Sequence, residues 1–335
     1  MSAKNSRQYN AIMKAAVHTR YGPPEVVRII EVPTPTAAED QLLVRVHATT
    51  VNQTDRHYRA ANPFFMRFVS GLARPKATIL GNEFAGEVEA IGRAVTSFAV
   101  GDRVFGYCEG PFGAHAEYLV VSANGCVAII PPGLSYDEAA PGTEGSHYAL
   151  SLITKAGVQR GQDILVYGAT GAIGSAAIQL LRVLGATVTA VCATAHLDLV
   201  EGLGADRVVD YTSQDFTRDN QRYDVVFDAY GMLSFFRCKR LLKPGGIYMS
   251  TGLGPFWVNA ILPLATPFLR GRKFVSAFPK IDQSIVQYLA GLMTSGEFRP
   301  VIDRRYPLNQ IVEAYRYVET GQKIGNVVIT FAPTS

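Results

Sequence analysis

The chain has 335 residues, of which 48% are hydrophobic and 18% are charged, and its formal net charge is +4. Such a length accommodates two domains, and the composition is that of a globular protein with a large core. The basic residues are scattered, which excludes a basic surface of the kind that binds nucleic acid. No apolar run approaches the ~20 residues that a membrane-spanning helix needs, so we expect no transmembrane segment.

Cysteine usage and the first residues bear on the compartment. The cysteines lie far apart and form no C-x-x-C pair: Cys108, Cys126, Cys192 and Cys238. This usage predicts a reducing, cytoplasmic location and offers no zinc-site spacing. Residues 1–12 lack a hydrophobic signal core, so we expect a loose extension ahead of a strand that begins at Met13.

From Met13 to about Pro132 the pattern is rich in strands. Apolar residues alternate or cluster over strand lengths at 42–51, 83–91 and 116–122, and Gly, Pro and Asp separate these runs. The pattern predicts an irregular, barrel-like β domain.

A glycine loop follows the apolar strand at 164–167, and a helix at 172–184 and a second strand at 187–191 come next. In such a βαβ unit a pyrophosphate approaches backbone N–H groups at the helix N-terminus. One glycine permits the turn, the next leaves room for phosphate, and the third lets the helix lie close to the strand. The residues that we expect to bind the dinucleotide here are Gly168, Ala169, Thr170, Gly171, Ala172, Ile173 and Gly174.

Strands alternate with helices from about Leu134 to Arg299, which predicts a parallel sheet buried on both faces. The last segment predicts a helix at 308–320 and a strand at 326–331 that return to the first domain. The expected domains are therefore 1–133 with 300–335, and 134–299. Prolines interrupt the apolar segment 254–271, which we expect to cover a substrate pocket or a subunit interface.

Several motifs in order make the chain resemble the medium-chain dehydrogenase/reductase superfamily, and within it the zinc-independent quinone oxidoreductase (zeta-crystallin-like) branch. The resemblance spans Met13 to Phe331. Its carriers are VNQTD from Val51, GNEFAGEVEAIG and AVGDRVFG within 81–106, GAHAEY from Gly113, the glycine loop, GADRVVDY from Gly204, LLKPGG from Leu241 and PLNQIVEAYRYVETGQKIGNVVIT from Pro307.

The resemblance implies an α/β fold, with a GroES-like irregular β-barrel catalytic domain and a doubly wound, parallel-sheet Rossmann domain. It further implies an active-site cleft between the domains, hydride transfer from a reduced nicotinamide and a dimeric or tetrameric assembly. We expect a homodimer.

Zinc is not expected. In zinc-using relatives the metal ligands are Cys, His and Cys at positions that correspond here to Asn52, Asn82 and about Thr143. Amides and a hydroxyl are poor zinc ligands, and the four-cysteine structural zinc lobe is also missing. Without a Lewis acid, enones and quinones are easier substrates than plain alcohols, because hydrogen bonds can stabilise the enolate that hydride addition forms.

The catalytic candidates are Asn52, Thr54 and His57. The Asn52 amide could orient the substrate carbonyl or the nicotinamide, or it could cap the following turn. The resemblance implies a proton relay through Thr54 and His57, and the alternative for His57 is a ribose contact or a surface position.

A second group of candidates faces the expected cleft. Glu144 could tune the substrate or cap the helix that begins there, and His147 is expected to contact cofactor or substrate. Tyr58, Phe65 and Trp257 could wall an apolar substrate pocket, although aromatic clusters are more often core.

The second strand of the βαβ unit ends without the acid that binds an NAD ribose. The residues from Cys192 to Leu197 include no carboxylate, and the next acid along the chain is Asp198. This permits a 2′-phosphate, and we expect NADPH, with NADH as the alternative because no cation stands at Ala195. The residues expected to bind at this end are Cys192, Thr194, His196 and Tyr211.

The sequence thus predicts a zinc-independent, NADPH-dependent oxidoreductase that reduces quinones or α,β-unsaturated carbonyls that are apolar and small to medium in size. One alternative is a carbonyl reductase or alcohol dehydrogenase on the same scaffold. Another is a non-catalytic NADPH-binding sensor or structural protein.

Overall fold

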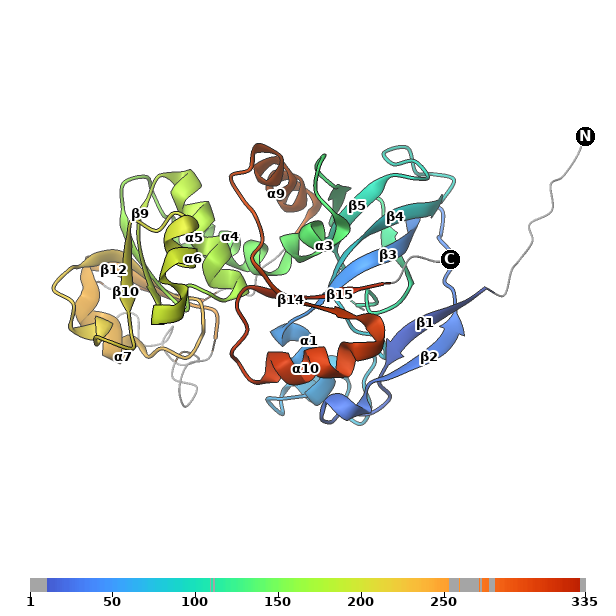
Figure 1. Cartoon of the computed structure of the whole chain (residues 1–335), viewed down its shortest axis with the longest axis horizontal. Coiled ribbons are helices and arrows are strands. Elements are labelled where there is room, and N and C mark those ends of the chain that lie inside the picture. The colour runs from blue at the N-terminus through green and yellow to red at the C-terminus, as the bar shows by residue number, and fades with distance from the viewer. Residues whose placement is uncertain are drawn as a thin grey trace, which may run out of the picture.

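The computed structural model describes residues 11–108, 110, 112–252, 259, 271, 273–276 and 281–331. These residues form two large β-sheets, which lie toward opposite ends of the long axis of the molecule in Figure 1. The blue-to-teal and red segments make up one half, and the green-to-orange segments make up most of the other. The two ends of the chain therefore contribute to the same half.

The first half is built on a seven-stranded sheet in the order β14-β15-β3-β4-β5-β7, with β6 paired to β3. Alternate residues of β3 are buried from Leu42 to Ala48, as expected for a strand with one face on a core. The strands are β3 (Gln41–Val51), β4 (Glu83–Ile91), β5 (Arg103–Tyr107), β6 (Tyr118–Ser122), β7 (Val127–Ile129), β14 (Ile302–Pro307) and β15 (Asn326–Thr330). A separate antiparallel pair, β1 (Ile12–Val17) and β2 (Arg28–Pro33), lies at the edge of this half.

The C-terminal segment returns to this half, as the sequence predicts. Strand β15 pairs antiparallel with β3, with Val327 opposite Val51. The predicted helix at 308–320 is a 3-10 turn (Leu308–Gln310) followed by α10 (Ile311–Glu319), which contacts α1 (Gln53–Ala60).

The second half is a six-stranded parallel sheet in the order β10-β9-β8-β11-β12-β13. Counted from β8, this is the 3-2-1-4-5-6 order of a doubly wound dinucleotide-binding sheet. Its strands are β8 (Asp163–Tyr167), β9 (Thr187–Cys192), β10 (Arg207–Asp210), β11 (Tyr223–Asp228), β12 (Leu242–Ser250) and β13 (Lys273–Val275). The helices of the second half are α4 (Glu144–Ala156), α5 (Ala172–Leu184), α6 (Leu197–Gly202), α7 (Phe235–Cys238) and α9 (Gln283–Ser295), the last of which contacts β7 of the first sheet.

One hydrophobic core connects the halves. A single buried cluster includes Ala85 and Phe105 of the first sheet together with Ile164 and Ile178 around the second. Helix α4, which starts at this junction, lies so close to α5 that a Cβ on Gly145 would be 2.6 Å from the Ala172 carbonyl oxygen. Among the described residues, no helix is both long and apolar enough to cross a bilayer.

Candidate active site

Helix α1 begins at the end of β3 and places the first two candidate residues. Asn52 is its N-cap: Asn52 Oδ1 accepts a hydrogen bond from the Asp55 N–H (3.1 Å), and Asp55 Oδ2 accepts one from the Asn52 N–H (3.0 Å). This reciprocal capping box fixes the start of the helix. The capping role considered for Asn52 is thus present in the structure, and it leaves the side-chain amide nitrogen for a second function.

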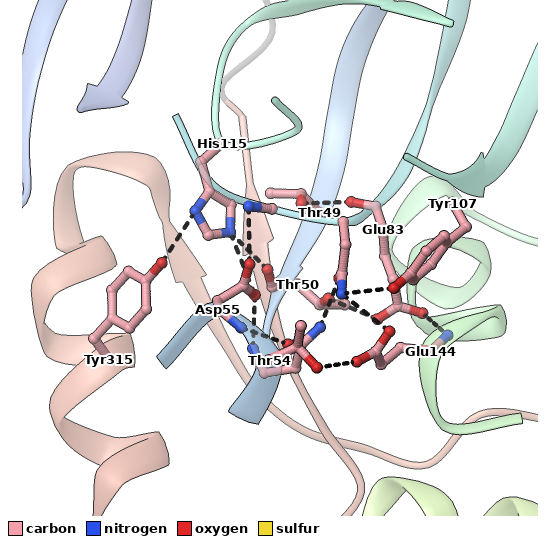
Figure 2. Close-up of polar contacts among 12 residues, drawn as sticks. Thr49, Thr50, Thr54, Asp55, Glu83, Tyr107, His115, Glu144 and Tyr315 are labelled. Atoms are coloured by element: carbon pink, nitrogen blue, oxygen red, sulfur yellow. Dashed lines mark hydrogen bonds and ion pairs between the residues drawn. The ribbon is translucent and has the colours of Figure 1, made fainter. Parts of the chain in front are cut away.

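The Asn52 amide nitrogen starts a chain of hydrogen bonds that ends at Glu144 and Thr54, the two residues labelled at the lower right and centre of Figure 2. Asn52 Nδ2 donates to Asn82 Oδ1 (2.7 Å), and Asn82 Nδ2 donates to Glu144 Oε2 (3.0 Å). The other carboxyl oxygen, Glu144 Oε1, accepts from the Thr54 hydroxyl (2.6 Å). The structure therefore brings Asn52, Thr54 and Glu144 together, with Asn82 as the connecting residue.

Glu83, not Glu144, caps helix α4. Glu83 Oε1 accepts hydrogen bonds from the backbone N–H groups of Glu144 (2.6 Å) and Thr143 (3.0 Å), and Glu83 Oε2 accepts from the Thr50 hydroxyl (2.6 Å). A carboxylate at this end complements the helix dipole. Glu144 is the acid in the first turn of α4, but its carboxyl bonds to Thr54 and Asn82, and Glu83, from β4, is the side chain that accepts from the first N–H groups of the helix.

Burial raises the pKa values of the carboxyl groups in this cluster. The pKa of Glu144 rises to about 8, mainly through loss of solvation and then through the neighbouring charge of Glu83. Burial also raises the pKa of Asp55, to about 7, and the pKa of Glu83. Two buried carboxylates side by side repel each other, so one of the pair holds a proton near neutral pH.

Three further polar groups surround the Glu144 carboxyl. The Tyr107 hydroxyl accepts a hydrogen bond from Asn82 Nδ2 (3.4 Å), and burial together with the charge of Glu144 raises the pKa values of Tyr107 and Tyr148. Lys323 lies half-buried in the loop before β15; burial lowers its pKa to about 8, against the opposing attraction of Glu83, Asp303 and Glu144. The side chains around Glu144 thus come from both halves of the chain.

The two histidine candidates lie outside this chain of hydrogen bonds. Within the described part of the molecule the His57 imidazole has no hydrogen-bond partner, and burial lowers its pKa. His147 is buried, its Nδ1 lies 2.9 Å from the Thr143 carbonyl oxygen, and burial lowers its pKa to about 4. The His147 ring lies edge-on to the Tyr107 ring. When the neutral imidazole donates from Nδ1 to the Thr143 carbonyl oxygen, its Nε2 is left as a hydrogen-bond acceptor.

The expected aromatic wall is not assembled around the cluster. Tyr58 packs edge-on against Phe112, and both lie against the hydrophobic cluster that includes the buried residues of α10. Phe65 is 37% exposed at the start of a short helix (Met66–Ser70). Trp257, like most of the apolar segment 254–271, lies outside the described residues. The role of these side chains in a substrate pocket stays a prediction.

The glycine loop has the geometry of a phosphate-binding turn. Gly168 has φ +77°, and a Cβ on Gly174 would lie 2.1 Å from the Gly168 carbonyl oxygen, so both positions need glycine. A Cβ on Gly171 would meet only the Gly168 oxygen, at 3.6 Å, and would otherwise point into open space. Because no side chain caps α5, the N–H groups of its first turn are left for a ligand.

The loop is also tied to the C-terminal segment. The Gly325 N–H donates to the Thr170 carbonyl oxygen (2.7 Å), and Gly325 forms a β-bridge with Gly171. The residue that precedes β15 therefore lies against the glycine loop.

At the end of β9 the structure adds an acid that the sequence pattern did not predict. The Thr194 hydroxyl donates to Asp210 Oδ2 (2.6 Å), so the carboxylate at the end of β10 reaches the side of β9. Cys192 is buried, and Tyr211 lines a surface pocket of about 380 Å³ together with Thr212, Ser213, Gln214, Asp215, Phe216, Tyr167 and Arg237. His196 lies half-buried beside Thr194 and outside that pocket.

The donor set at the hydrogen-bonded cluster does not suit zinc. Across the part of the chain that the structure describes, no three His, Cys, Asp or Glu side chains are grouped as metal ligands would be. The side chains at the three corresponding positions are Asn52, Asn82 and Thr143, and hydrogen bonds already engage all three.

Comparisons with known proteins now identify the family. The chain matches the alcohol dehydrogenase GroES-like domain over residues 38–132 and the zinc-binding dehydrogenase family over residues 203–329. It is 33% identical over 330 residues to the 2-methylene-furan-3-one reductase of Solanum lycopersicum, covering 95% of this chain and 79% of that protein. It is 31% identical to the chloroplastic NADPH-dependent alkenal/one oxidoreductase of Arabidopsis thaliana, again over 95% and 79%.

The chain belongs to the medium-chain dehydrogenase/reductase superfamily. Within the superfamily it falls in the zinc-independent quinone oxidoreductase branch, and it is an NAD(P)H-dependent oxidoreductase. The quinone oxidoreductase of Coxiella burnetii has the same architecture, with a TM-score of 0.84 at 26% identity over 96% of this chain and 99% of that one. The expected fold class, a GroES-like domain joined to a Rossmann domain, is confirmed.

Sequence reasoning missed several members of this medium-chain dehydrogenase/reductase site. Asn82 was noted only as a lost zinc ligand, and the buried positions of Glu83, Tyr107 and Lys323 were not anticipated. A usable signal was present in GNEFAG, because an acid directly before the apolar residues Phe84 and Ala85 is at risk of burial and then needs a partner.

Proposed function

We propose that this chain reduces quinones or α,β-unsaturated carbonyls with NADPH and without zinc. The observation that carries the proposal is the chain of hydrogen bonds from Asn52 through Asn82 to Glu144 and Thr54. Two of its members, Asn52 and Asn82, stand at positions that correspond to metal ligands of zinc-using relatives, and at the third position Thr143 is bonded to Glu83. Names of similar proteins, such as alkenal/one oxidoreductase and quinone oxidoreductase, support the substrate class.

The coenzyme would bind along the Gly168–Gly174 loop, where the open face of Gly171 and the uncapped start of α5 suit a pyrophosphate. When bound, a reduced nicotinamide supplies hydride to the electron-poor carbon of the substrate. Asn52 and Thr54 orient the carbonyl oxygen by hydrogen bonds, and these bonds strengthen as negative charge develops on that oxygen. His57 remains a candidate for a contact with the coenzyme ribose.

NADPH is preferred over NADH in this proposal because β9 carries no acid of its own at its end. The Asp210 carboxylate reaches the same place, but hydrogen bonds from Thr194 and Thr212 already engage it. These bonds hold the pKa of Asp210 below its ordinary value, so it stays charged. Comparison of kcat/KM for the two coenzymes tests this part.

An NADPH-oxidation screen tests the function. Its acceptors should include quinones, enones, aldehydes and saturated ketones, each measured with and without a chelator. We expect turnover of quinones and enones that the chelator leaves unchanged. Turnover of saturated ketones alone would favour the carbonyl reductase alternative, and chelator-sensitive turnover would refute the absence of zinc. Tight NADPH binding without turnover of any acceptor would favour the sensor alternative.

Assembly and location complete the proposal. We expect a homodimer in a reducing, cytoplasmic compartment, where the four free and buried thiols would remain reduced. Light scattering of the purified chain and fractionation of the source cells are the corresponding measurements.

A further inference from the structure

We propose that Glu144 supplies the proton of the reduction by way of the Thr54 hydroxyl, an inference that rests on the proposed function. Helix α4 presents Glu144 at its first residue, and α1 presents Thr54 two residues after the Asn52 cap. The two side chains meet at 2.6 Å, although they come from different halves of the molecule (Figure 2).

The geometry provides a directed path. Glu144 Oε2 is held by Asn82 Nδ2 at 3.0 Å, which leaves Oε1 facing the Thr54 hydroxyl. Glu144 is 6% exposed, whereas Thr54 is half-buried, so the hydroxyl is the more accessible end of the pair. A hydroxyl both donates and accepts, so it can pass a proton between the carboxyl and a substrate oxygen beside it.

The surroundings explain why this carboxyl holds a proton. The neighbouring acids Glu83 and Asp55 favour its protonated form, whereas Thr54, Tyr107 and the Lys323 cation in the loop before β15 favour the carboxylate and oppose this effect. Burial and the Glu83 charge raise the pKa of Glu144 to about 8. An acid with a pKa near the working pH is suited to proton delivery.

The proposed step balances. As the hydride forms the new C–H bond at the β-carbon, the C=C electron pair moves toward the carbonyl and the oxygen gains negative charge. When Glu144 is protonated, its Oε1–H donates across the 2.6 Å contact to the Thr54 oxygen, which frees the Thr54 proton for the substrate. The substrate oxygen takes the Thr54 hydroxyl proton, and Thr54 takes the Glu144 proton, so Glu144 becomes a carboxylate and later regains a proton from water. The enol then rearranges to the saturated ketone, and one hydride and one proton have been consumed.

His57 is the competing proton source, and the structure favours Glu144. The His57 imidazole has no hydrogen-bond partner among the described residues, and burial lowers its pKa, so at neutral pH it carries less charge than a free histidine. Glu144, by contrast, is bonded directly to the hydroxyl that the substrate would meet.

The test compares Glu144→Gln with the wild-type chain on an enone and on a quinone. Gln keeps the shape and the hydrogen-bonding capacity but has no transferable proton. We expect kcat on the enone to fall about 100-fold, and kcat on the quinone to fall less than tenfold because a hydroquinone oxyanion is the weaker base. The decline of wild-type enone turnover with rising pH, centred near the Glu144 pKa, should disappear in the variant.

Matched variants separate proton transfer from structure. Thr54→Val should reproduce the enone loss, and Thr54→Ser should restore most of the rate, while Glu201→Gln, an exposed acid on α6, should behave as wild type. In the coenzyme-free protein, infrared spectra should show a protonated carboxyl band that Glu144→Gln alone removes. Identical spectra for wild type and Glu144→Gln would overturn the proposal.

Failure of the inference differs from failure of the proposed function. A wild-type chain that reduces neither acceptor overturns the function itself. A wild-type chain that reduces both, with Glu144→Gln equal to it at every pH, overturns only the role of Glu144.

Discussion

The Thr54 hydroxyl donates a 2.6 Å hydrogen bond to Glu144 Oε1 across 90 positions of sequence. The bond joins α1 of the GroES-like half to α4 beside the Rossmann sheet, at the place where one hydrophobic core serves both. The packing of the two halves therefore fixes the Thr54 hydroxyl and the Glu144 carboxyl relative to each other.

Asn52 carries two roles that substitution can separate. Asn52→Ala removes both the cap and the bond to Asn82, so we expect a loss of about 1 kcal/mol in unfolding free energy and a clear fall in kcat. Asn52→Ser keeps a capping oxygen and should restore stability without restoring kcat. Denaturant unfolding, steady-state kinetics and NADPH binding measure the three quantities. Equal losses of kcat and coenzyme affinity in Asn52→Ser would assign Asn52 to the scaffold.

Two glycines of the coenzyme loop should respond differently to alanine. Gly171→Ala has space for its Cβ in the protein, so we expect an almost unchanged melting temperature and weakened NADPH binding. Gly174→Ala places a Cβ 2.1 Å from a backbone oxygen and should lower the melting temperature before any ligand is added. Thermal unfolding and fluorescence titration with NADPH distinguish the two. Unimpaired coenzyme binding by Gly171→Ala would argue against a phosphate at this position.

Asp210 is expected to limit the preference for NADPH. Its carboxylate, held by Thr194, lies where a Rossmann fold binds the adenosine ribose, and a 2′-phosphate there would be repelled. Asp210→Asn should raise the ratio of kcat/KM for NADPH over that for NADH, by roughly tenfold for 1.4 kcal/mol of relieved repulsion. Asp219→Asn is the control, because Asp219 bonds to Arg207 at the opposite end of β10. An unchanged ratio would place the 2′-phosphate elsewhere.

Stability should depend on pH through Glu144. Its pKa is raised to about 8 in the folded chain from 4.5, so the folded state retains a proton that the unfolded state loses. The unfolding free energy therefore falls as pH rises between these values, by at most about 1.4 kcal/mol per pH unit from this group. Glu144→Gln removes this contribution, so its stability relative to wild type should increase from pH 5 to pH 8. Parallel pH profiles in denaturant unfolding would contradict the assignment.

Local sequence patterns predicted many helices and strands well, because the bounds of such an element depend mainly on residues that are neighbours in the sequence. The helix at Ala172–Leu184 and the strand at Glu83–Ile91 have the predicted bounds, since glycine placement and apolar runs specify them directly. The expected strand at 116–122 begins two residues late, at Tyr118, because the preceding residues bond to β1 instead.

The candidate site was only partly predictable, for a physical reason. Asn52 and Thr54 follow a strand end and could be named from position alone. The pairing of Asn82 with Glu144 spans 62 positions and depends on how α4 docks against the first sheet, which no local pattern encodes. Likewise, an acid for the end of β9 was sought on that strand, whereas Asp210 comes from its neighbour.

The Gly325–Thr170 hydrogen bond has a mechanical consequence. This bond joins the residue before β15 to the glycine loop, where we expect phosphate to bind. The two halves of the molecule are therefore held together at that point. Any movement of the two halves apart at this point would have to rotate about the Gly325–Thr170 hydrogen bond or break it.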